Sequence, residues 1–226
     1  MAPHNPFVLR FFRWYIRRHL RRHFHAVRML GQAPYVPLDR PLIAFINHPS
    51  WWDPLTGLFL SSLLYPERQL YGPMDAGQLK RFPILGKCGL FGIEPGTALG
   101  ARQLLRAADA IFAQPGRSLW LTPQGRFADV RERPLDFARG LEFLTRRHPS
   151  AALLPIALEY TFWNDRLPEI LVHPGALCSA EAAEDSLAAA MDTLRSAALT
   201  RDAARFTTLL SGKSGTGGVY DIRAGN

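Results

Sequence analysis

The side chains best suited to chemistry lie together at residues 45–57, where an apolar run ends in the letters NHPSWWD. His48 and Asp53 are five residues apart, so a helix would turn them about 140° away from each other and a strand would put them on opposite faces. Pro49 favours an extended His48 and can itself occupy the first turn of a helix. The chain is therefore expected to turn between the two residues and bring them together.

A histidine at the end of a strand, facing an aspartate at the start of a helix, is the arrangement of an oriented general base. The carboxylate binds one ring nitrogen, and the other nitrogen is left to take a proton. The sequence contains no GxSxG motif, which favours direct transfer to an acceptor hydroxyl over a covalent enzyme intermediate. The alternative is a core histidine that binds a backbone carbonyl, with Asp53 as a helix N-cap.

Four blocks of the sequence resemble those of the glycerolipid (lysophospholipid) acyltransferases, and they occur in the family's order. NHPSWWD resembles the His-x4-Asp block, and KRFPILGKCGLFGIEPG resembles the second block, a Pro-x-x-Gly followed by a glycine-rich turn. LTPQGRFAD and DFARG resemble the third block, Phe-Pro-Glu-Gly-Thr-Arg and the Phe-x-x-Gly after it. LLPIAL resembles the fourth block, Val-Pro-Val, so the resemblance spans about residues 40–160.

This resemblance implies a reaction and a set of site residues. His48 would be the general base and Asp53 its orienting partner. The acyl donor would be a thioester of acyl-CoA or acyl carrier protein, the acceptor would be a lipid hydroxyl, and no metal or other cofactor would be needed. The tryptophans would line a channel or pack in the core. Substrate-binding residues expected in the matching blocks are Asn47, Trp51, Trp52, Gln124, Gly125 and Arg126.

The sequence departs from the family pattern where the acceptor's phosphate would be held. Gln124 replaces the glutamate of the third block, and Arg126 with Phe127 replaces Thr-Arg. Pro95 stands where the second block has another arginine. We therefore expect an acceptor other than lysophosphatidate, such as another lysophospholipid or a glycosylated lipid. Three further arginines would form either a replacement phosphate-binding cluster or a solvated face: Arg131, Arg133 and Arg139.

Positive charge is concentrated near the N-terminus. The net charge is +8, and residues 1–38 contain seven arginines and no acid, whereas the rest of the chain has 20 basic and 19 acidic residues. Residues 7–30 mix these arginines with aromatic and aliphatic residues, which predicts a basic amphipathic helix. Its apolar stripe would consist of Phe12, Ile16, Leu20, Phe24 and Val27, widened by Phe11 and Tyr15.

Three interpretations of this helix remain open: a helix packed on the core, a membrane-surface anchor and a nucleic-acid-binding arm. We favour the anchor and expect no nucleic acid as partner. Uncharged runs fall short of the roughly 18 residues of a spanning helix, and arginines interrupt any signal-peptide core. The protein is expected to lie at an anionic surface on the cytoplasmic face of a membrane, as a peripheral or monotopic protein.

Strand-like and helix-like runs alternate along the rest of the chain, which is typical of α/β proteins. The fold class expected is a single α/β domain with a mixed central sheet flanked by helices, plus the N-terminal helix. Residues 1–38 would form the interface helix and a loop, 39–210 the acyltransferase domain, and 211–226 a glycine-rich tail. Strands are predicted at 42–46, 89–93, 118–125, 151–160 and 169–175, and helices at 54–64, 97–114, 140–147 and 180–210.

The sequence thus predicts an acyltransferase that acts on a lysophospholipid or a related lipid. Two alternatives remain: a non-catalytic lipid- or nucleic-acid-binding protein with the same fold, and a thioesterase that uses water as acceptor. Cys88 and Cys178 lie outside any CxxC or Cys/His cluster, so neither a disulfide framework nor a zinc site is supported. No oligomeric state is predicted.

Overall fold

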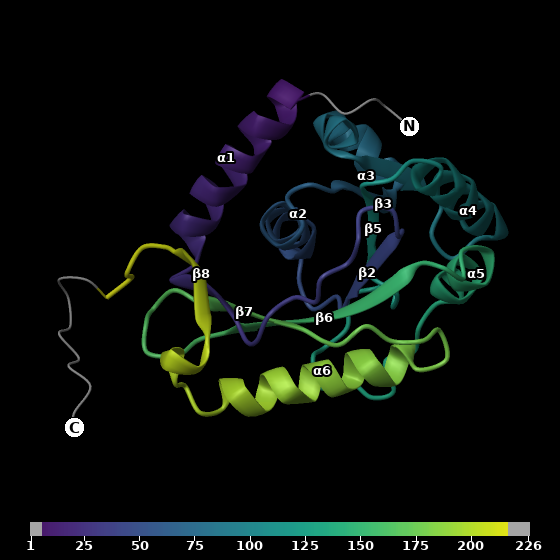
Figure 1. Ribbon diagram of the computed structural model, residues 1–226. Coiled ribbons are helices and arrows are strands. Elements are labelled where there is room, and N and C mark those ends of the chain that lie inside the picture. The colour runs from purple at the N-terminus through teal and green to yellow at the C-terminus, as the bar shows by residue number, and fades with distance from the viewer. Residues whose placement is uncertain (1–5, 217–226) are drawn as a thin grey trace.

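In the computed structural model, which describes residues 6–216, eight strands form one mixed sheet (Figure 1). The strand order is β4-β3-β5-β2-β6-β7-β1-β8. Neighbouring strands are parallel except at β6–β7 and β1–β8, which are antiparallel. The strands are β1 (Ala26–Met29), β2 (Leu42–Ile46), β3 (Gln69–Asp75), β4 (Leu90–Ile93), β5 (Arg117–Leu121), β6 (Ala152–Thr161), β7 (Glu169–Pro174) and β8 (Thr207–Ser211).

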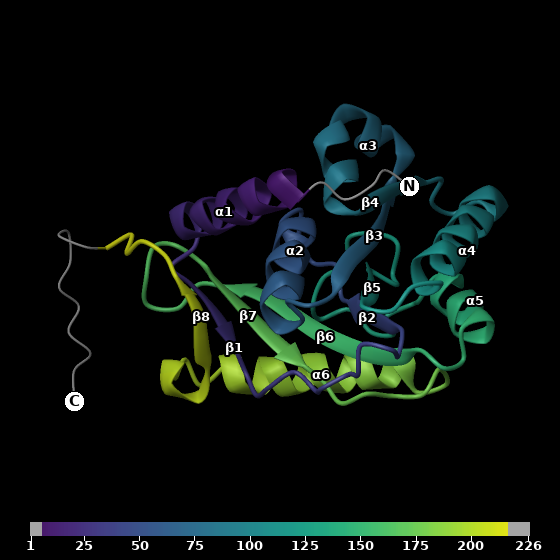
Figure 2. The same cartoon turned by 45° about the horizontal axis from the view of Figure 1, so that its top comes forward.

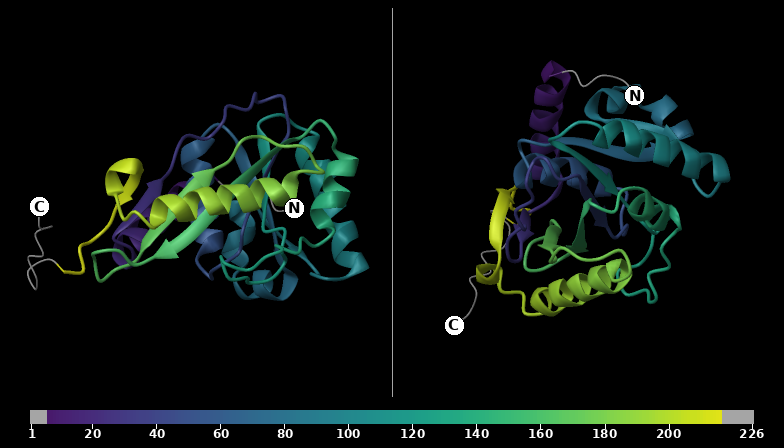
Figure 3. Two further views of the ribbon diagram at one scale, coloured as in Figure 1. Left: turned by 90° about the horizontal axis from the view of Figure 1, so that it is seen from below. Right: turned by 45° about the vertical axis from the view of Figure 1, so that its right-hand side comes forward.

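Helices cover both faces of this sheet. α1 and α2 pack on one face, α4, α5 and α6 pack on the other, and Figure 3 shows α6 running along its face. Within the described residues, no helix has the length and hydropathy that crossing a membrane requires. The helices are α1 (Pro6–His23), α2 (Asp53–Leu64), α3 (Ala76–Arg81), α4 (Ala98–Phe112), α5 (Gly140–Arg147), α6 (Ala183–Ala198) and the 3-10 turns η1 (Pro83–Cys88) and η2 (Ala203–Arg205).

The central strand β2 is buried along its whole length because helices cover it on both sides. Ile43 and Phe45 point to the face that carries α4 and α6. Leu42, Ala44 and Ile46 point to the face that carries α1 and α2. The sequence of β2 is therefore an unbroken apolar run. The arrangement of sheet and helices confirms the fold class expected from their alternation along the chain.

The predicted helix over residues 7–30 is too long by seven residues. α1 ends at His23, and residues 26–29 form β1, which pairs with β7 and β8. The N–H of His25 donates to the carbonyl of Pro168. Hydrogen bonds to the sheet therefore replace those of the helix directly after α1 ends. Ile16 and Leu20 of the predicted apolar stripe face the protein, at 2% and 0% exposed, but Phe11 and Tyr15, which were expected to widen it, are 59% and 40% exposed.

The observed elements differ from the predicted ones in two other places. The helix predicted over 180–210 ends at Ala198, and residues 207–211 form β8 against β1. β3 was not predicted, because Gly72 and Pro73 argue locally against a strand. The glycine has a tertiary reason: a Cβ at Gly72 would lie 3.0 Å from the carbonyl oxygen of Trp120 on β5.

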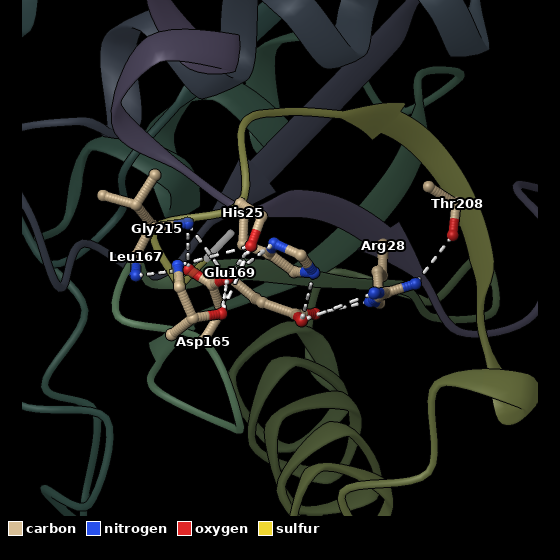
Figure 4. A network of polar contacts seen from close by, with 9 residues as sticks. His25, Arg28, Asp165, Leu167, Glu169, Thr208 and Gly215 are labelled. Carbon is tan, nitrogen blue, oxygen red and sulfur yellow. Dashed lines mark hydrogen bonds and ion pairs between the residues drawn. The ribbon is translucent and has the colours of Figure 1, made fainter. Parts of the chain in front are cut away.

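The first part of the predicted glycine-rich tail is packed on the surface. The N–H groups of Gly212 and Lys213 bind carbonyls near the C-terminal end of α1, at 2.8 and 3.0 Å. Asp165, in the loop between β6 and β7, accepts from the N–H of Gly215 at 2.9 Å (Figure 4). These contacts fasten the end of α1 to the sheet; residues 217–226 of the predicted tail lie outside the described part of the chain.

A buried arginine joins the loops at one end of the sheet. Arg68 is 4% exposed, and its guanidinium donates to four carbonyl oxygens, those of Val36, Pro37, Arg40 and Arg117. Its charge is thus balanced by backbone dipoles in place of a carboxylate. Burial accordingly lowers the pKa of Arg68.

Replacing this arginine should destabilise the protein. Arg68→Met should lower the free energy of unfolding by about 2–4 kcal/mol, because carbonyls left without donors cost about 1–3 kcal/mol each and water can satisfy only some of them. Urea titration followed by circular dichroism measures the change. The control is Arg146→Met, since that side chain is 71% exposed and should contribute less than about 0.5 kcal/mol. Equal stability of the two variants would contradict the role assigned to Arg68.

Candidate active site

The predicted dyad lies at the C-terminal edge of the parallel strands. His48 follows β2 and Asp53 opens α2, with Pro54 in the first turn of that helix. β2 is parallel to both β5 and β6, so the loop after β5 comes to the same edge. Ligands of α/β proteins usually bind at this edge, beyond the carboxyl ends of the strands.

His48 and Asp53 are in direct contact. Nδ1 of His48 lies 2.6 Å from Oδ2 of Asp53. Because a carboxylate can only accept, Nδ1 carries the proton and Nε2 holds a lone pair. Nε2 has no hydrogen-bond partner among residues 6–216, and the histidine side chain is 17% exposed. The turn expected between the two residues is confirmed, and it presents a base at the protein surface.

Asp53 is buried and receives donors from two further groups. It is 3% exposed; Oδ2 also accepts from the N–H of Ser50 at 3.0 Å, and Oδ1 accepts from the hydroxyl of Tyr160 at 2.7 Å. The hydroxyl of Thr56 lies 3.0 Å from that of Tyr160. Sequence reasoning missed Tyr160, because it lies in β6, 107 positions from Asp53 along the chain. Only the pairing of β2 with β6 brings them together.

Asn47 holds the histidine loop to the sheet. Its Nδ2 donates to the carbonyl of Leu158 at 2.9 Å, and its Oδ1 accepts from the N–H of Leu158 at 2.7 Å. The residue is 1% exposed. With both polar atoms of its side chain engaged by β6, Asn47 positions the motif and is not placed to contact a substrate.

The loop after β5 holds both backbone polar groups of His48. The N–H of His48 donates to Oε1 of Gln124 at 3.0 Å, and the carbonyl of His48 accepts from the N–H of Ala128 at 2.9 Å. Gln124 is 6% exposed. Gly125 lies beside it with a φ of 65°, a left-handed turn that favours glycine. The third block thus fixes the orientation of the base, and the amide nitrogen of Gln124 has no partner within the described residues.

Aromatic residues lie next to His48, either in space or in the sequence. The ring of Phe127 lies 4.4 Å from that of His48, between centroids, and is 58% exposed. Trp51 is 66% exposed. Trp52 is half-buried and contacts the rings of His19 and His23 in α1 and that of Phe24 just after it. Trp51 is therefore not a core residue, and Trp52 attaches α1 to the start of α2.

The arginines near the third block do not converge on His48. Arg126 pairs with Glu132 through both of its terminal nitrogens. The other three are exposed and each is paired with an acid: Arg131 with Asp129, Arg133 with Asp192 and Arg139 with Glu142. The replacement cluster for a phosphate is therefore not assembled, and the solvated face is the arrangement found.

The two cysteines do not offer a nucleophile. Cys88 is buried, and its burial raises the pKa of the thiol to about 11. Burial also raises the pKa of Cys178. Both thiols are consequently protonated near neutral pH, when a nucleophilic cysteine must be a thiolate.

Comparison with known proteins identifies the fold. No family model and no curated protein matches the sequence. The structure is similar to the crystal structure of the 1-acyl-sn-glycerophosphate (LPA) acyltransferase PlsC from Thermotoga maritima, with a TM-score of 0.56 and 14% sequence identity. The match covers 86% of this chain and 79% of that one. The fold is acyltransferase-like.

Proposed function

We propose that this protein is an acyltransferase that moves a fatty acyl group from a thioester, acyl-CoA or acyl carrier protein, to a hydroxyl of a lysophospholipid or related lipid. The observation that carries the proposal is the 2.6 Å contact between His48 and Asp53, which leaves Nε2 of the histidine free to act as a base. The acyltransferase-like fold and the four sequence blocks support it.

The reaction needs one base and no covalent enzyme intermediate. Nε2 of His48 takes the proton of the acceptor hydroxyl as that oxygen attacks the thioester carbonyl. When the tetrahedral intermediate breaks its C–S bond, the imidazolium returns the proton to the leaving thiolate. Asp53 stabilises the imidazolium and fixes its tautomer. A thioesterase would use water in the same steps, but the exposed aromatic rings of Trp51 and Phe127 favour a lipid acceptor.

The proposed acceptor is a lipid other than lysophosphatidate, because the described residues near His48 do not form a phosphate-binding site. The oxygen of Gln124 is engaged by His48, so only its NH2 group remains to meet a substrate. An amide nitrogen donates hydrogen bonds without carrying charge. Together with the four ion-paired arginines, this favours a sugar or another neutral polar head group.

We further propose that α1 lies on an anionic membrane surface, such as the cytoplasmic leaflet. Its outer side bears Phe7, Phe11, Trp14 and Tyr15, which are 84%, 59%, 57% and 40% exposed. Six exposed arginines of α1 form no ion pair within the described residues: Arg10, Arg13, Arg17, Arg18, Arg21 and Arg22. Such a mixture of aromatic and basic side chains is typical of interfacial helices.

The end of α3 and the start of η1, beside α1, also combine exposed basic residues with exposed apolar ones. η1 packs against α1, and Figure 2 shows α3 rising on the side of the molecule that carries α1. Phe82 and Ile84 are 42% and 43% exposed. Lys80 and Arg81 precede them, also exposed. The proposed membrane surface thus extends from α1 onto the end of α3.

The dyad is tested by removing each partner. His48→Ala should lower acyl transfer by roughly 10²–10⁴ fold, the usual contribution of a general base, and Asp53→Asn should also be damaging. Release of free thiol from an acyl thioester measures the rate, with and without a lipid alcohol, which separates transfer from hydrolysis.

A second histidine and aspartate provide the control. His148 and Asp109 lie 3.2 Å apart near the N-terminal edge of the parallel strands, opposite the site. His148→Ala and Asp109→Asn should keep the wild-type rate. A folded His48→Ala enzyme with near-full turnover would refute the assignment.

The amide of Gln124 is tested by exchange for a carboxylate. Gln124→Glu keeps an acceptor for the N–H of His48 but loses the donor, so use of the native acceptor should fall roughly 10- to 100-fold while the KM of the thioester is unchanged. A panel of lysophosphatidate, other lysophospholipids and glycolipids measures the preference. Gln124→Met, which loses both groups, should impair every acceptor. If Gln124→Glu matches the wild type throughout, Gln124 only positions His48.

The membrane surface is tested by point substitution, because deleting residues 1–30 would also remove β1 and the buried side chains of α1. Phe11→Ser with Trp14→Ser should lower binding to anionic vesicles at least tenfold, since each aromatic ring contributes about 1.5–3 kcal/mol when buried. Added salt should weaken the binding further. Leu199→Ser is the control, because this residue is 76% exposed at the end of α6 on the opposite face. Unchanged sedimentation with vesicles, or tighter binding to nucleic acid, would count against the surface.

A further inference from the structure

A chain of three hydrogen bonds links α2, β6 and the dyad. The hydroxyl of Tyr160 lies 2.7 Å from Oδ1 of Asp53 and 3.0 Å from the hydroxyl of Thr56. Asp53 in turn lies 2.6 Å from His48. We propose that Tyr160 is a positioning residue for acyl transfer: it fixes the rotation of the Asp53 carboxylate and through it the tautomer of His48. This inference rests on the proposed function.

The direction of every proton in this chain follows from the groups present. The carboxylate of Asp53 only accepts, so the single hydroxyl proton of Tyr160 points to Oδ1. Thr56 must then donate its proton to the oxygen of Tyr160. Burial, and next the negative charge of Asp53, raise the pKa of Tyr160 well above its usual value. The phenol therefore remains protonated near neutral pH and remains a donor.

The position of Tyr160 is set by the sheet and not by the loop that carries His48. It lies near the end of β6, whose preceding residues Ile156 and Leu158 are 0% and 1% exposed. Its ring contacts that of Phe24, 5.9 Å away between centroids. The loop contributes a separate donor to the same carboxylate, the N–H of Ser50. Removing the phenol oxygen would leave Oδ1 of Asp53 without its donor and free the carboxylate to turn.

Free rotation of the carboxylate would weaken the bond that keeps the proton on Nδ1. Nε2 would then carry the proton in part of the molecules, and a protonated Nε2 cannot act as a base. The expected defect lies in the chemical step, because the hydroxyl of Tyr160 is engaged by Asp53 and Thr56 and acts on His48 only through Asp53. A residue with a purely structural role would change stability and leave the tautomer of His48 as it is.

The test compares Tyr160→Phe with Tyr65→Phe in the full-length protein. Both tyrosines donate from a part-buried hydroxyl, but Tyr65 follows the C-terminal end of α2, whereas Asp53 opens that helix, and Tyr65 donates to the carbonyl of Pro34. Tyr160→Phe should lower kcat about 10- to 100-fold, as expected for losing a hydrogen bond to a charged group, with both KM values within twofold of the wild type. Tyr65→Phe should leave kcat unchanged. A retained kcat in Tyr160→Phe overturns the proposal.

A second readout needs no turnover. In ¹⁵N-labelled protein, the two ring nitrogens of His48 should report a single tautomer in the wild type and in Tyr65→Phe, and a mixture in Tyr160→Phe. Thr56→Val should give a smaller shift in the same direction, and Thr56→Ser, which keeps the donor, should recover most of it. If the tautomer of His48 is unchanged in Tyr160→Phe, the proposal fails, whatever the rate.

The two proposals can fail separately. If the wild type transfers no acyl group to any acceptor on the panel, the proposed function is lost, while the spectra of His48 still decide the role of Tyr160. If the wild type is active and Tyr160→Phe is too, with an unchanged spectrum, only the positioning role is lost.

Discussion

The buried carboxylate of Asp53 is the constraint on which the site depends. An ionised carboxylate that is 3% exposed is costly unless donors surround it. Here the donors come from three places: His48 at the end of β2, Ser50 in the turn, and Tyr160 on β6. Each of these bonds fixes part of the geometry. Together they hold a histidine with one nitrogen protonated and the other facing outward.

The strand β6 is the platform for this arrangement. It pairs with β2 through five registered positions, and it also binds the side chains of Asn47, just after β2, and Asp53, at the start of α2. The loop after β5 adds two bonds to the backbone of His48. Two motif residues expected to meet substrate thus support His48: Asn47 uses both polar atoms of its side chain to bind β6, and Gln124 uses its oxygen to bind the backbone of His48.

The first helix combines a structural face with an exposed one. Ile16 and Leu20 pack in the core above the sheet, while Phe7, Phe11 and Trp14 point away from it. The chain continues from α1 into β1, and residues 212 and 213 bind backbone carbonyls near the end of the helix, so α1 is attached to the sheet that carries His48. A helix held in this way fixes the orientation of the whole domain on any surface to which its outer side binds. His48 and the exposed rings of Trp51 and Phe127 would then have a set height above that surface.

Much of the fold and the dyad followed from the sequence itself, because local chemistry determines them. The alternation of apolar runs predicted the α/β class, and the five-residue spacing of His48 and Asp53 predicted a turn that brings the two together. The remainder depended on pairing between distant segments, which no local pattern encodes. Residues 26–29 became a strand only because β7 and β8 offered partners, and β3 formed despite Gly72 and Pro73 because β5 approaches its backbone closely. In the same way, Tyr160 reached Asp53, and Gln124 reached His48, only because parallel pairing aligned the ends of β2, β5 and β6.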